Sequence, residues 1–184
     1  MGKYEVLELE EMKYYLYLPT NFDENKKYPL MMFLHGAGER GELIQVRRWG
    51  PLQEIDNGME LNCVIIAPFC EGLRTWFDYG ERLSKLVDLY RHKNYIDIER
   101  VSVTGLSMGG YGTWHMGMSH PEWFSAIAPV CGGGYIWDTE MLKHLKVWTF
   151  HGDKDTCVPM TESTKLVEKA KTDHNIDIKL TIYK

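Results

Sequence analysis

Short apolar runs alternate with amphipathic stretches along the chain, after an extended start at Lys13–Leu18 that Pro19 ends. Within Glu81–His92, apolar residues recur at helical spacing with charged residues between them, which predicts an amphipathic helix. The apolar runs predict strands at Leu30–Leu34, Cys63–Ala67, Val101–Gly105, Ala126–Val130, Val147–Phe150 and Ile178–Tyr183. The remaining patterns predict helices at Pro51–Asn57, Met108–Ser119, Asp138–His144 and Met160–Lys171.

Strands that alternate with helices favour an α/β fold, in which a mainly parallel central sheet carries helices on both faces. Such sheets bind ligands at the carboxyl ends of their strands, so the loops that follow strands are where chemistry is expected. No low-complexity tract, linker or repeat divides residues 1–184, which predicts a single domain.

The charge and composition exclude several classes of function. The chain has 21 Lys and Arg against 26 Asp and Glu, a net charge of −5, which gives no basic surface for nucleic acid or an anionic membrane. The longest apolar runs, such as Pro29–Leu34 and Cys63–Phe69, are far shorter than the roughly 20 residues that span a bilayer. We therefore expect neither nucleic acid nor a membrane as a partner. Residues Met1–Glu10 lack the features of a secretory signal, which predicts a cytoplasmic location.

The sequence contains no motif for a metal, a nucleotide or a redox pair. The 4 cysteines form no CxxC pair and no HExxH motif occurs, so we expect no metal site. Gly132-Gly133-Gly134 lacks both the P-loop lysine and the spacing of a dinucleotide fingerprint. We therefore expect a protein that works without a cofactor.

A candidate nucleophile stands between a predicted strand and a predicted helix, in Gly105-Leu106-Ser107-Met108-Gly109. This is the strand–turn–helix context that the GxSxG nucleophile elbow requires. The glycines remove the Cβ atoms that would collide across a sharp turn, and the turn holds the Ser107 hydroxyl above the sheet. The backbone N–H of Met108 then points at the same place, where it can stabilise an oxyanion. The alternative is a Gly/Ser-rich turn without catalytic consequence.

A glycine-rich loop, His35–Gly41, follows the predicted strand Leu30–Leu34. A backbone N–H from this loop commonly completes an oxyanion hole, and we nominate that of Ala37, with Gly36 and Gly38 as conformational supports. We expect His35 to fix the loop through hydrogen bonds of its ring. Glu39 and Arg40 are expected to brace the loop as a pair.

The loop His151–Pro159 supplies candidate acids, again after a predicted strand. Asp153 and Asp155 are both candidates for a carboxylate that orients a catalytic histidine, and Asp155 is preferred because it lies further into the loop. Aromatic residues in the loops after two other predicted strands are candidates for substrate binding, Trp76 and Trp137 above all; the others are Phe69, Phe77 and Tyr135. Their alternative role is ordinary packing over the core.

Three motifs together resemble those of the α/β-hydrolase superfamily. They are LHGAGERG at Leu34–Gly41, GLSMGGYGTW at Gly105–Trp114 and HGDKDTCVP at His151–Pro159. In this order they are similar to those of compact serine esterases, a group that includes dienelactone-hydrolase-like, feruloyl-esterase-like and prolyl-oligopeptidase-like enzymes. The resemblance implies Ser107 as the nucleophile, Met108 and the Ala37 loop as the oxyanion hole, and Asp155 as the acid of the triad.

One feature departs from this pattern. Members of the family carry the triad histidine on a loop after the last strand, usually followed by a further helix. Here the histidine after Asp155 is His174, which precedes the last predicted strand. We therefore expect a C-terminally shortened α/β-hydrolase domain that lacks its catalytic base, and whose exposed C-terminal sheet surface favours a homo-oligomer.

The leading hypothesis is a serine carboxylesterase that hydrolyses short-chain or aryl carboxylic esters, so its partner is a small-molecule ester. The first alternative is a hydrolase-fold protein or binding module that keeps the pocket without turnover. The second alternative is a serine peptidase, as in the prolyl-oligopeptidase relatives.

Overall fold

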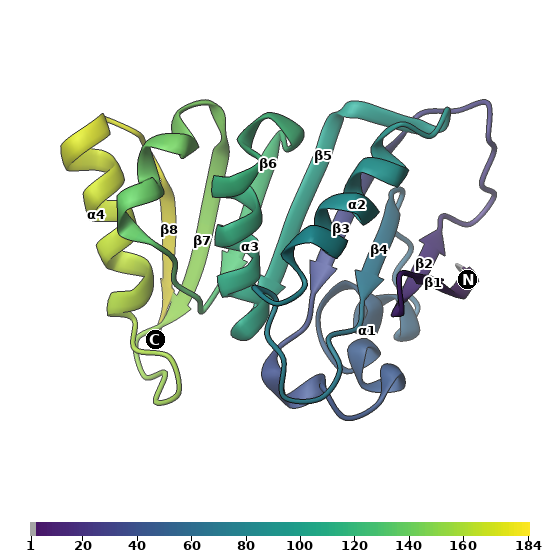
Figure 1. Ribbon diagram of the computed structural model, residues 1–184, viewed down its shortest axis with the longest axis horizontal. Coiled ribbons are helices and arrows are strands. Elements are labelled where there is room, and N and C mark those ends of the chain that lie inside the picture. Colours follow the sequence, from purple (N-terminus) through teal and green to yellow (C-terminus); the bar gives the residue numbers. More distant parts are fainter. Residues whose placement is uncertain (1–2) are drawn as a thin grey trace.

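A single mixed sheet organises the chain in the computed structural model, which describes residues 3–184 (Figure 1). Its strands are β1 (Lys3–Leu9), β2 (Met12–Leu18), β3 (Tyr28–Leu34), β4 (Val64–Pro68), β5 (Ile96–Leu106), β6 (Ala126–Val130), β7 (Lys146–Gly152) and β8 (Lys179–Tyr183). They lie in the order β1-β2-β4-β3-β5-β6-β7-β8. The pairs β1–β2 and β2–β4 are antiparallel, and every other neighbouring pair is parallel.

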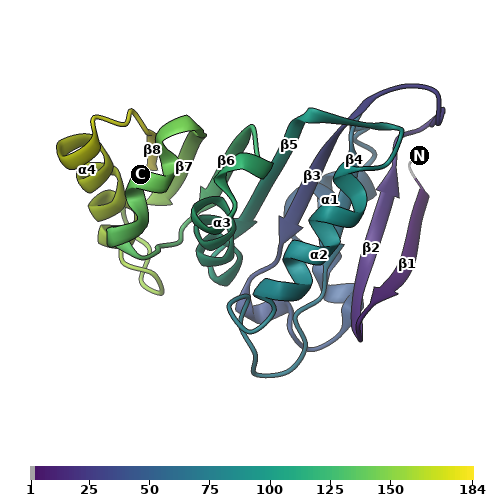
Figure 2. The same cartoon turned by 45° about the horizontal axis from the view of Figure 1, so that its top comes forward.

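Helices cover both faces of this sheet, as predicted (Figure 2). The α-helices are α1 (Gly50–Asp56), α2 (Gly80–Arg91), α3 (Met108–Ser119) and α4 (Thr161–His174). The 3₁₀ helices are η1 (Ala37–Glu39), η2 (Leu43–Arg48), η3 (Pro121–Trp123) and η4 (Ile136–His144). The larger core lies between the sheet and α2, α3 and α4, and a smaller core lies under α1 and η2 on the opposite face. The predicted α/β fold with a mainly parallel sheet is therefore confirmed.

Most predicted elements are present, and three of the differences have a clear physical reason or a clear change of helix type. β1 was not predicted, because this edge strand carries acidic residues and has no buried side chain among the residues whose burial is described. β5 begins at Ile96 rather than Val101; its start was missed because the segment 97–100 carries three charged residues and has no buried side chain. The segment predicted as a short helix at Asp138–His144 is a longer 3₁₀ helix. Within residues 3–184, no helix is long and apolar enough to cross a membrane.

The register of the parallel strands brings four loops to one edge of the sheet. Leu34 pairs with Gly105, Leu106 pairs with Val130, and Val130 pairs with Phe150. The chain segments that leave β3, β5, β6 and β7 therefore start side by side. All three sequence motifs are brought together at this edge.

Candidate active site

Ser107 occupies the turn between β5 and α3 in a strained backbone conformation. Its φ is +55° and its ψ is −119°, in a region that non-glycine residues seldom adopt. The Ser107 N–H donates to the carbonyl of Val130 at 2.9 Å, and the Tyr111 N–H donates back to the Ser107 carbonyl at 3.1 Å. α3 starts at Met108, so the N–H of that residue belongs to the positive end of the helix.

Close backbone packing explains the glycines on either side of Ser107. A Cβ at Gly105 would lie 2.5 Å from the Leu34 carbonyl oxygen, and a Cβ at Gly109 would overlap the same oxygen. Side chains at either position would push β3 away from the turn. Glycine is thus required for β3, β5 and α3 to meet beneath the serine.

His35 anchors the glycine-rich loop and is electrically neutral. It is buried, and its Nδ1–H donates to the Gly36 carbonyl at 2.7 Å while Nε2 accepts from the Cys70 N–H at 3.0 Å. Burial lowers the pKa of His35 to about 4. Both ring nitrogens are occupied, so this ring braces the loop, as the sequence predicted, and has no free nitrogen for a base.

The rest of the loop forms η1, with the nominated Ala37 at its start. Arg40 donates to the carbonyls of Ala37 at 3.0 Å and Arg74 at 3.2 Å, so it braces the loop. The Glu39 side chain is buried against Gly36 of the same loop, where a Cβ would lie 2.9 Å from its Oε2. A Cβ at Gly38 would meet nothing within 4 Å, so the space there does not require glycine.

Of the two candidate acids, Asp155 has the side chain that is held by hydrogen bonds. Its Oδ1 accepts from the N–H groups of Cys157 and Val158, both at 2.9 Å. These donors, that of Val158 first, hold the pKa of Asp155 below its ordinary value, so the carboxylate is ionised at neutral pH. Asp153 has an exposed side chain, and its N–H donates to the carbonyl of Tyr183 at 2.9 Å.

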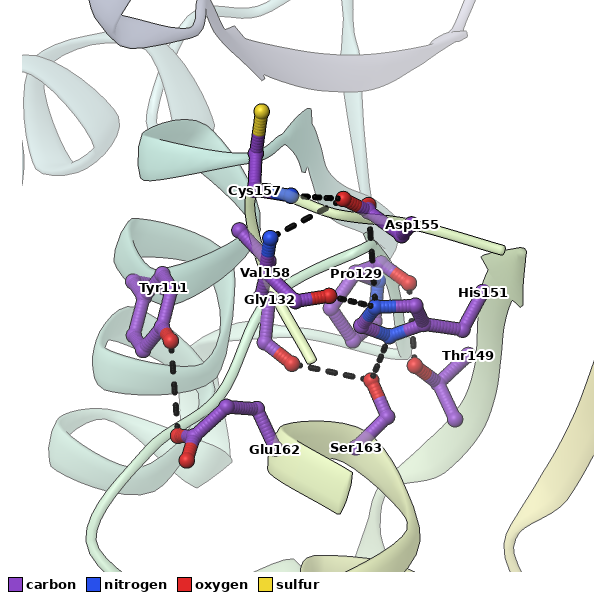
Figure 3. A network of polar contacts seen from close by, with 10 residues as sticks. All are labelled: Tyr111, Pro129, Gly132, Thr149, His151, Asp155, Cys157, Val158, Glu162 and Ser163. Atoms are coloured by element: carbon purple, nitrogen blue, oxygen red, sulfur yellow. Dashed lines mark hydrogen bonds and ion pairs between the residues drawn. The ribbon is translucent and has the colours of Figure 1, made fainter. Parts of the chain in front are cut away.

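His151 lies under the Asp155 loop and is wholly enclosed (Figure 3). Its Nδ1 is 2.8 Å from the Ser163 hydroxyl and its Nε2 is 2.8 Å from the Val158 carbonyl. Asp155 Oδ2 lies 3.8 Å from the same Nε2. Both ring nitrogens are again occupied, so His151 does not offer a base to Ser107.

The other histidines lie on helices or beside them. His120 contacts the Ser84 hydroxyl and stacks on Trp123, and His92 contacts the carbonyl of Asp88. His174 ends α4, before β8, as the sequence indicated. No hydrogen bond found within residues 3–184 joins a histidine ring to the Ser107 hydroxyl.

Cys131 is a neighbour of Ser107 that the sequence did not single out. It follows β6 with a φ of +40°, and its N–H donates to the carbonyl of Phe150 at 2.7 Å. Burial raises the pKa of its thiol, and the Asp155 carboxylate raises it further, while the Ser107 N–H opposes this rise. The thiol therefore lies within electrostatic reach of both Ser107 and Asp155. Its place after a predicted strand was the available signal.

The structure distinguishes between the candidate aromatic residues. Trp76 is completely buried and its indole N–H donates to the His35 carbonyl at 2.9 Å, so it supports the loop from beneath and does not face a ligand. Trp137 is 76% exposed and lies against the ammonium group of Lys169, 5.0 Å from its ring centre. The packing alternative therefore describes Trp76.

Two other loop aromatics come together around a cavity of about 290 Å³. The rings of Phe77 and Tyr135 are 6.3 Å apart, and His115 of α3 lies 5.0 Å from Phe77. The remaining lining residues are Met118, Ser119, Gly134, Asp138 and Met141. The cavity is thus built from the segment before α2, α3 and the segment after β6.

No family model matches the chain, but individual known proteins are similar to it. The chain is 28% identical over 145 residues to poly(3-hydroxyalkanoate) depolymerase C of Paucimonas lemoignei, an alignment that covers 71% of this chain and 33% of that protein. It is also 28% identical over 137 residues to dipeptidyl-peptidase 5 of Porphyromonas gingivalis, covering 67% of this chain and 19% of that protein.

A solved structure of a thermostable esterase superimposes with a TM-score of 0.80 and 31% identity, covering 99% of this chain and 54% of that one. The chain therefore has the α/β-hydrolase fold, and its resemblance to esterases and peptidases of this superfamily is confirmed. The chain spans about a third or less of these curated relatives and about half of the solved esterase.

Proposed function

We propose that this chain is a serine carboxylesterase domain that hydrolyses short-chain or aryl carboxylic esters through an acyl-enzyme on Ser107. The observation that carries the proposal is the positive φ of Ser107 at a strand–helix turn, directly before the N-terminus of α3. That conformation is strained, and strained backbone of this kind clusters at catalytic positions.

In the proposed reaction, the Ser107 hydroxyl oxygen attacks the ester carbonyl carbon, and the hydroxyl proton passes to solvent water or hydroxide. The backbone N–H groups of Met108 and Ala37 stabilise the oxyanion, and the alcohol leaves as the acyl-enzyme forms. Water then attacks the acyl group and restores the serine. Asp155, ionised and held by two N–H donors, is the proposed acid of the triad.

Neither His35 nor His151 can accept the Ser107 proton, because both ring nitrogens of each are engaged in hydrogen bonds. An oxyanion hole and bound substrate retain a catalytic factor on the order of 10³ over water when a triad member is missing. We therefore expect serine-dependent hydrolysis of activated esters at a modest rate.

The aryl part of the proposed substrate range is supported by the cavity beside Phe77 and Tyr135. Aromatic walls with a few polar groups are typical of sites that bind rings. His115 lies eight residues after Ser107, about 12 Å along the helix. An aryl group bound there would belong to the distal part of an extended ester.

Two other functions compete with this proposal. A peptidase is suggested by the dipeptidyl-peptidase relative, but an amide needs a proton donor for its leaving group, and the engaged rings of His35 and His151 do not supply one. A binding module without turnover is the other candidate, and the engaged rings of His35 and His151 favour it because they leave Ser107 without a base.

The test is the initial rate of hydrolysis of p-nitrophenyl butyrate between pH 6 and 9, measured for the chain and for Ser107→Ala. We expect turnover above the buffer rate that is lost in Ser107→Ala, because the nucleophile is gone. Ser125→Ala is the matched control, since Ser125 precedes β6 at the opposite edge of the sheet and donates to the Val101 carbonyl. It is expected to keep the full rate.

Labelling with a p-nitrophenyl phosphonate gives a second measurement that does not depend on turnover. The phosphonate is expected to attach to Ser107 in peptide mass spectra and not to attach to the Ser107→Ala chain. Equal rates for the chain and Ser107→Ala, together with no labelled serine, would leave the binding module as the better description. Hydrolysis of butyryl p-nitroanilide at a rate comparable to that of p-nitrophenyl butyrate would favour the peptidase.

A further inference from the structure

The hydrogen bonds around His151 fix where its protons lie. The Ser163 hydroxyl has a single proton and lies 2.8 Å from both the Gly132 carbonyl oxygen and His151 Nδ1. A carbonyl only accepts, so the hydroxyl must donate to Gly132. His151 Nδ1 must then carry a proton and donate it to the hydroxyl oxygen.

The other nitrogen of the ring faces a second carbonyl. Nε2 lies 2.8 Å from the carbonyl oxygen of Val158, which also only accepts. Nε2 therefore needs a proton as well. A ring with protons on both nitrogens is an imidazolium cation, so the satisfied network contains a positive charge.

A counter-ion for this charge is in place. Asp155 Oδ2 lies 3.8 Å from Nε2, and the side chain of His151 is wholly shielded from solvent. A buried charge is tolerated when it is paired and all its donors are satisfied, which is the arrangement here. The pKa of Asp155 is lowered by the N–H groups of Val158 and Cys157 first, and attraction to a charged His151 lowers it further.

The remaining titratable groups around His151 do not replace Asp155 in this role. At the start of α4, Glu162 accepts from Tyr111 at 3.3 Å and pairs with Lys165 at 2.7 Å. Asp153 lies in the same loop as Asp155 with an exposed side chain, and Cys157 is exposed. The thiol of Cys131 has a raised pKa and is therefore neutral.

His35 provides an internal contrast. One of its nitrogens donates to a carbonyl, but the other accepts from the Cys70 N–H, which requires an unprotonated nitrogen. The partners of these two buried histidines thus assign a neutral ring to His35 and a positive ring to His151.

We propose that His151 is a buried imidazolium that ties the Asp155 loop to α4 and to the segment after β6, and so acts as the positioning residue for Asp155. The charge of the ring follows from its own partners. The positioning role rests on the proposed function, because it matters for catalysis only if Asp155 is the acid of the triad.

The charge state is tested by long-range ¹H–¹⁵N correlation spectra of the histidine rings at pH 7. The two nitrogens of an imidazolium have similar ¹⁵N chemical shifts, whereas in a neutral ring the protonated and the unprotonated nitrogen have clearly different ¹⁵N chemical shifts. We expect His151 to give the first pattern and His35 the second, with the proton of His35 on Nδ1. The His151 signals are identified by their loss in His151→Gln. An unprotonated nitrogen in His151 at pH 7 would overturn the proposal.

Two variants test the cause of the charge. Asp155→Asn removes the counter-ion, so His151 is expected to lose its second proton at a lower pH than in the unchanged chain. Asp153→Asn is the matched control in the same loop and is expected to leave the His151 titration unchanged. Equal effects of the two substitutions would contradict the pairing with Asp155.

The positioning role has its own readout in the pH profile of Ser107-dependent hydrolysis. Gln at position 151 keeps a donor for the Val158 carbonyl but carries no charge, so the rate is expected to fall several-fold in kcat with little change in KM. The unchanged chain should lose activity at the pH where the spectra show His151 losing its proton, and His151→Gln should not show this loss. An unaltered rate profile in His151→Gln would overturn the positioning role, while a lack of esterase activity in every chain would instead contradict the proposed function.

Discussion

His35 and His151 each lie at the end of an apolar strand, and each is almost fully buried. His35 has one acceptor and one donor as partners, whereas His151 has two oxygen acceptors and a carboxylate. Since a ring nitrogen must match its partner, the hydrogen-bond partners of each ring decide its charge. Sequence alone gives two similar histidines after strands and leaves this difference hidden.

The low pKa of His35 predicts a dependence of stability on pH. Its ordinary value is 6.5 and its folded value is about 4, so between these limits the unfolded chain binds a proton that the folded chain does not. Stability is therefore expected to fall as the pH drops from about 6.5 toward 4 and to be unaffected by this group at higher pH. At pH 5 the loss is about 2 kcal/mol relative to pH 7.

Urea unfolding at pH 7 and pH 5 measures this effect in the chain and in His35→Asn. Asn keeps a donor for the Gly36 carbonyl but does not titrate, so the variant is expected to lose about 2 kcal/mol less between the two values. Other groups titrate alike in both chains and cancel in the comparison. The same loss in both chains would show that His35 does not stay neutral in the folded state.

At the scale of elements, the junction of β3, β5 and α3 depends on the absence of side chains. Gly109→Ala would place a Cβ onto the Leu34 carbonyl, in backbone that has no room to move. We expect it to destabilise the fold by about 3 kcal/mol or more, measured by urea unfolding.

Gly38→Ala is the matched control for this substitution, because a Cβ there meets nothing within 4 Å. It is expected to change stability by less than about 1 kcal/mol. If the two variants were equally stable, the close approach of β3 to the turn would not be what the motif glycines provide.

The elements whose bounds were predicted correctly have a clear apolar pattern and flanking residues, such as glycine or proline, that end a helix or strand. Met108–Ser119 and Ala126–Val130 match α3 and β6 at both ends. β1 and the first part of β5 were missed because charged residues interrupt their apolar pattern, and their pairing with a neighbouring strand is what makes them strands. Pairing of this kind joins distant segments and leaves no local signal.

In the candidate site, too, features with a local sequence signal were predicted and features that depend on long-range packing were not. Ser107 and Asp155 were nominated because glycines and loop position mark them in the sequence. The burial of Trp76 and the meeting of Phe77 with Tyr135 depend on how three loops pack over the sheet, which residue types do not reveal. Likewise, the partners of Arg40 are backbone carbonyls, one of them 34 positions away in the chain, and no side-chain pattern indicates them.

At the scale of the whole molecule, the two faces of the sheet are covered unequally. α2, α3 and α4 cover one face, but on the other face the smaller core lies over β2, β3 and β4. Strand register places Trp148, Phe150 and Tyr183 on this second face, along β7 and β8. Among residues 3–184, no helix packs on that part of the sheet (Figure 2). Trp148 and Tyr183 are 43% and 61% exposed.

An uncovered aromatic strip of this kind favours association between copies of the chain, because contact removes apolar area from water. β8 is also an edge strand and pairs with β7 alone among the described strands. We expect self-association that strengthens with concentration in sedimentation velocity, and that weakens about tenfold in Trp148→Ser. Trp137→Ser is the matched control, since it removes an exposed tryptophan that lies beside α4 on the opposite side of the sheet. A chain that stays monomeric at every concentration, or equal effects of the two substitutions, would show that this face does not mediate contact between copies.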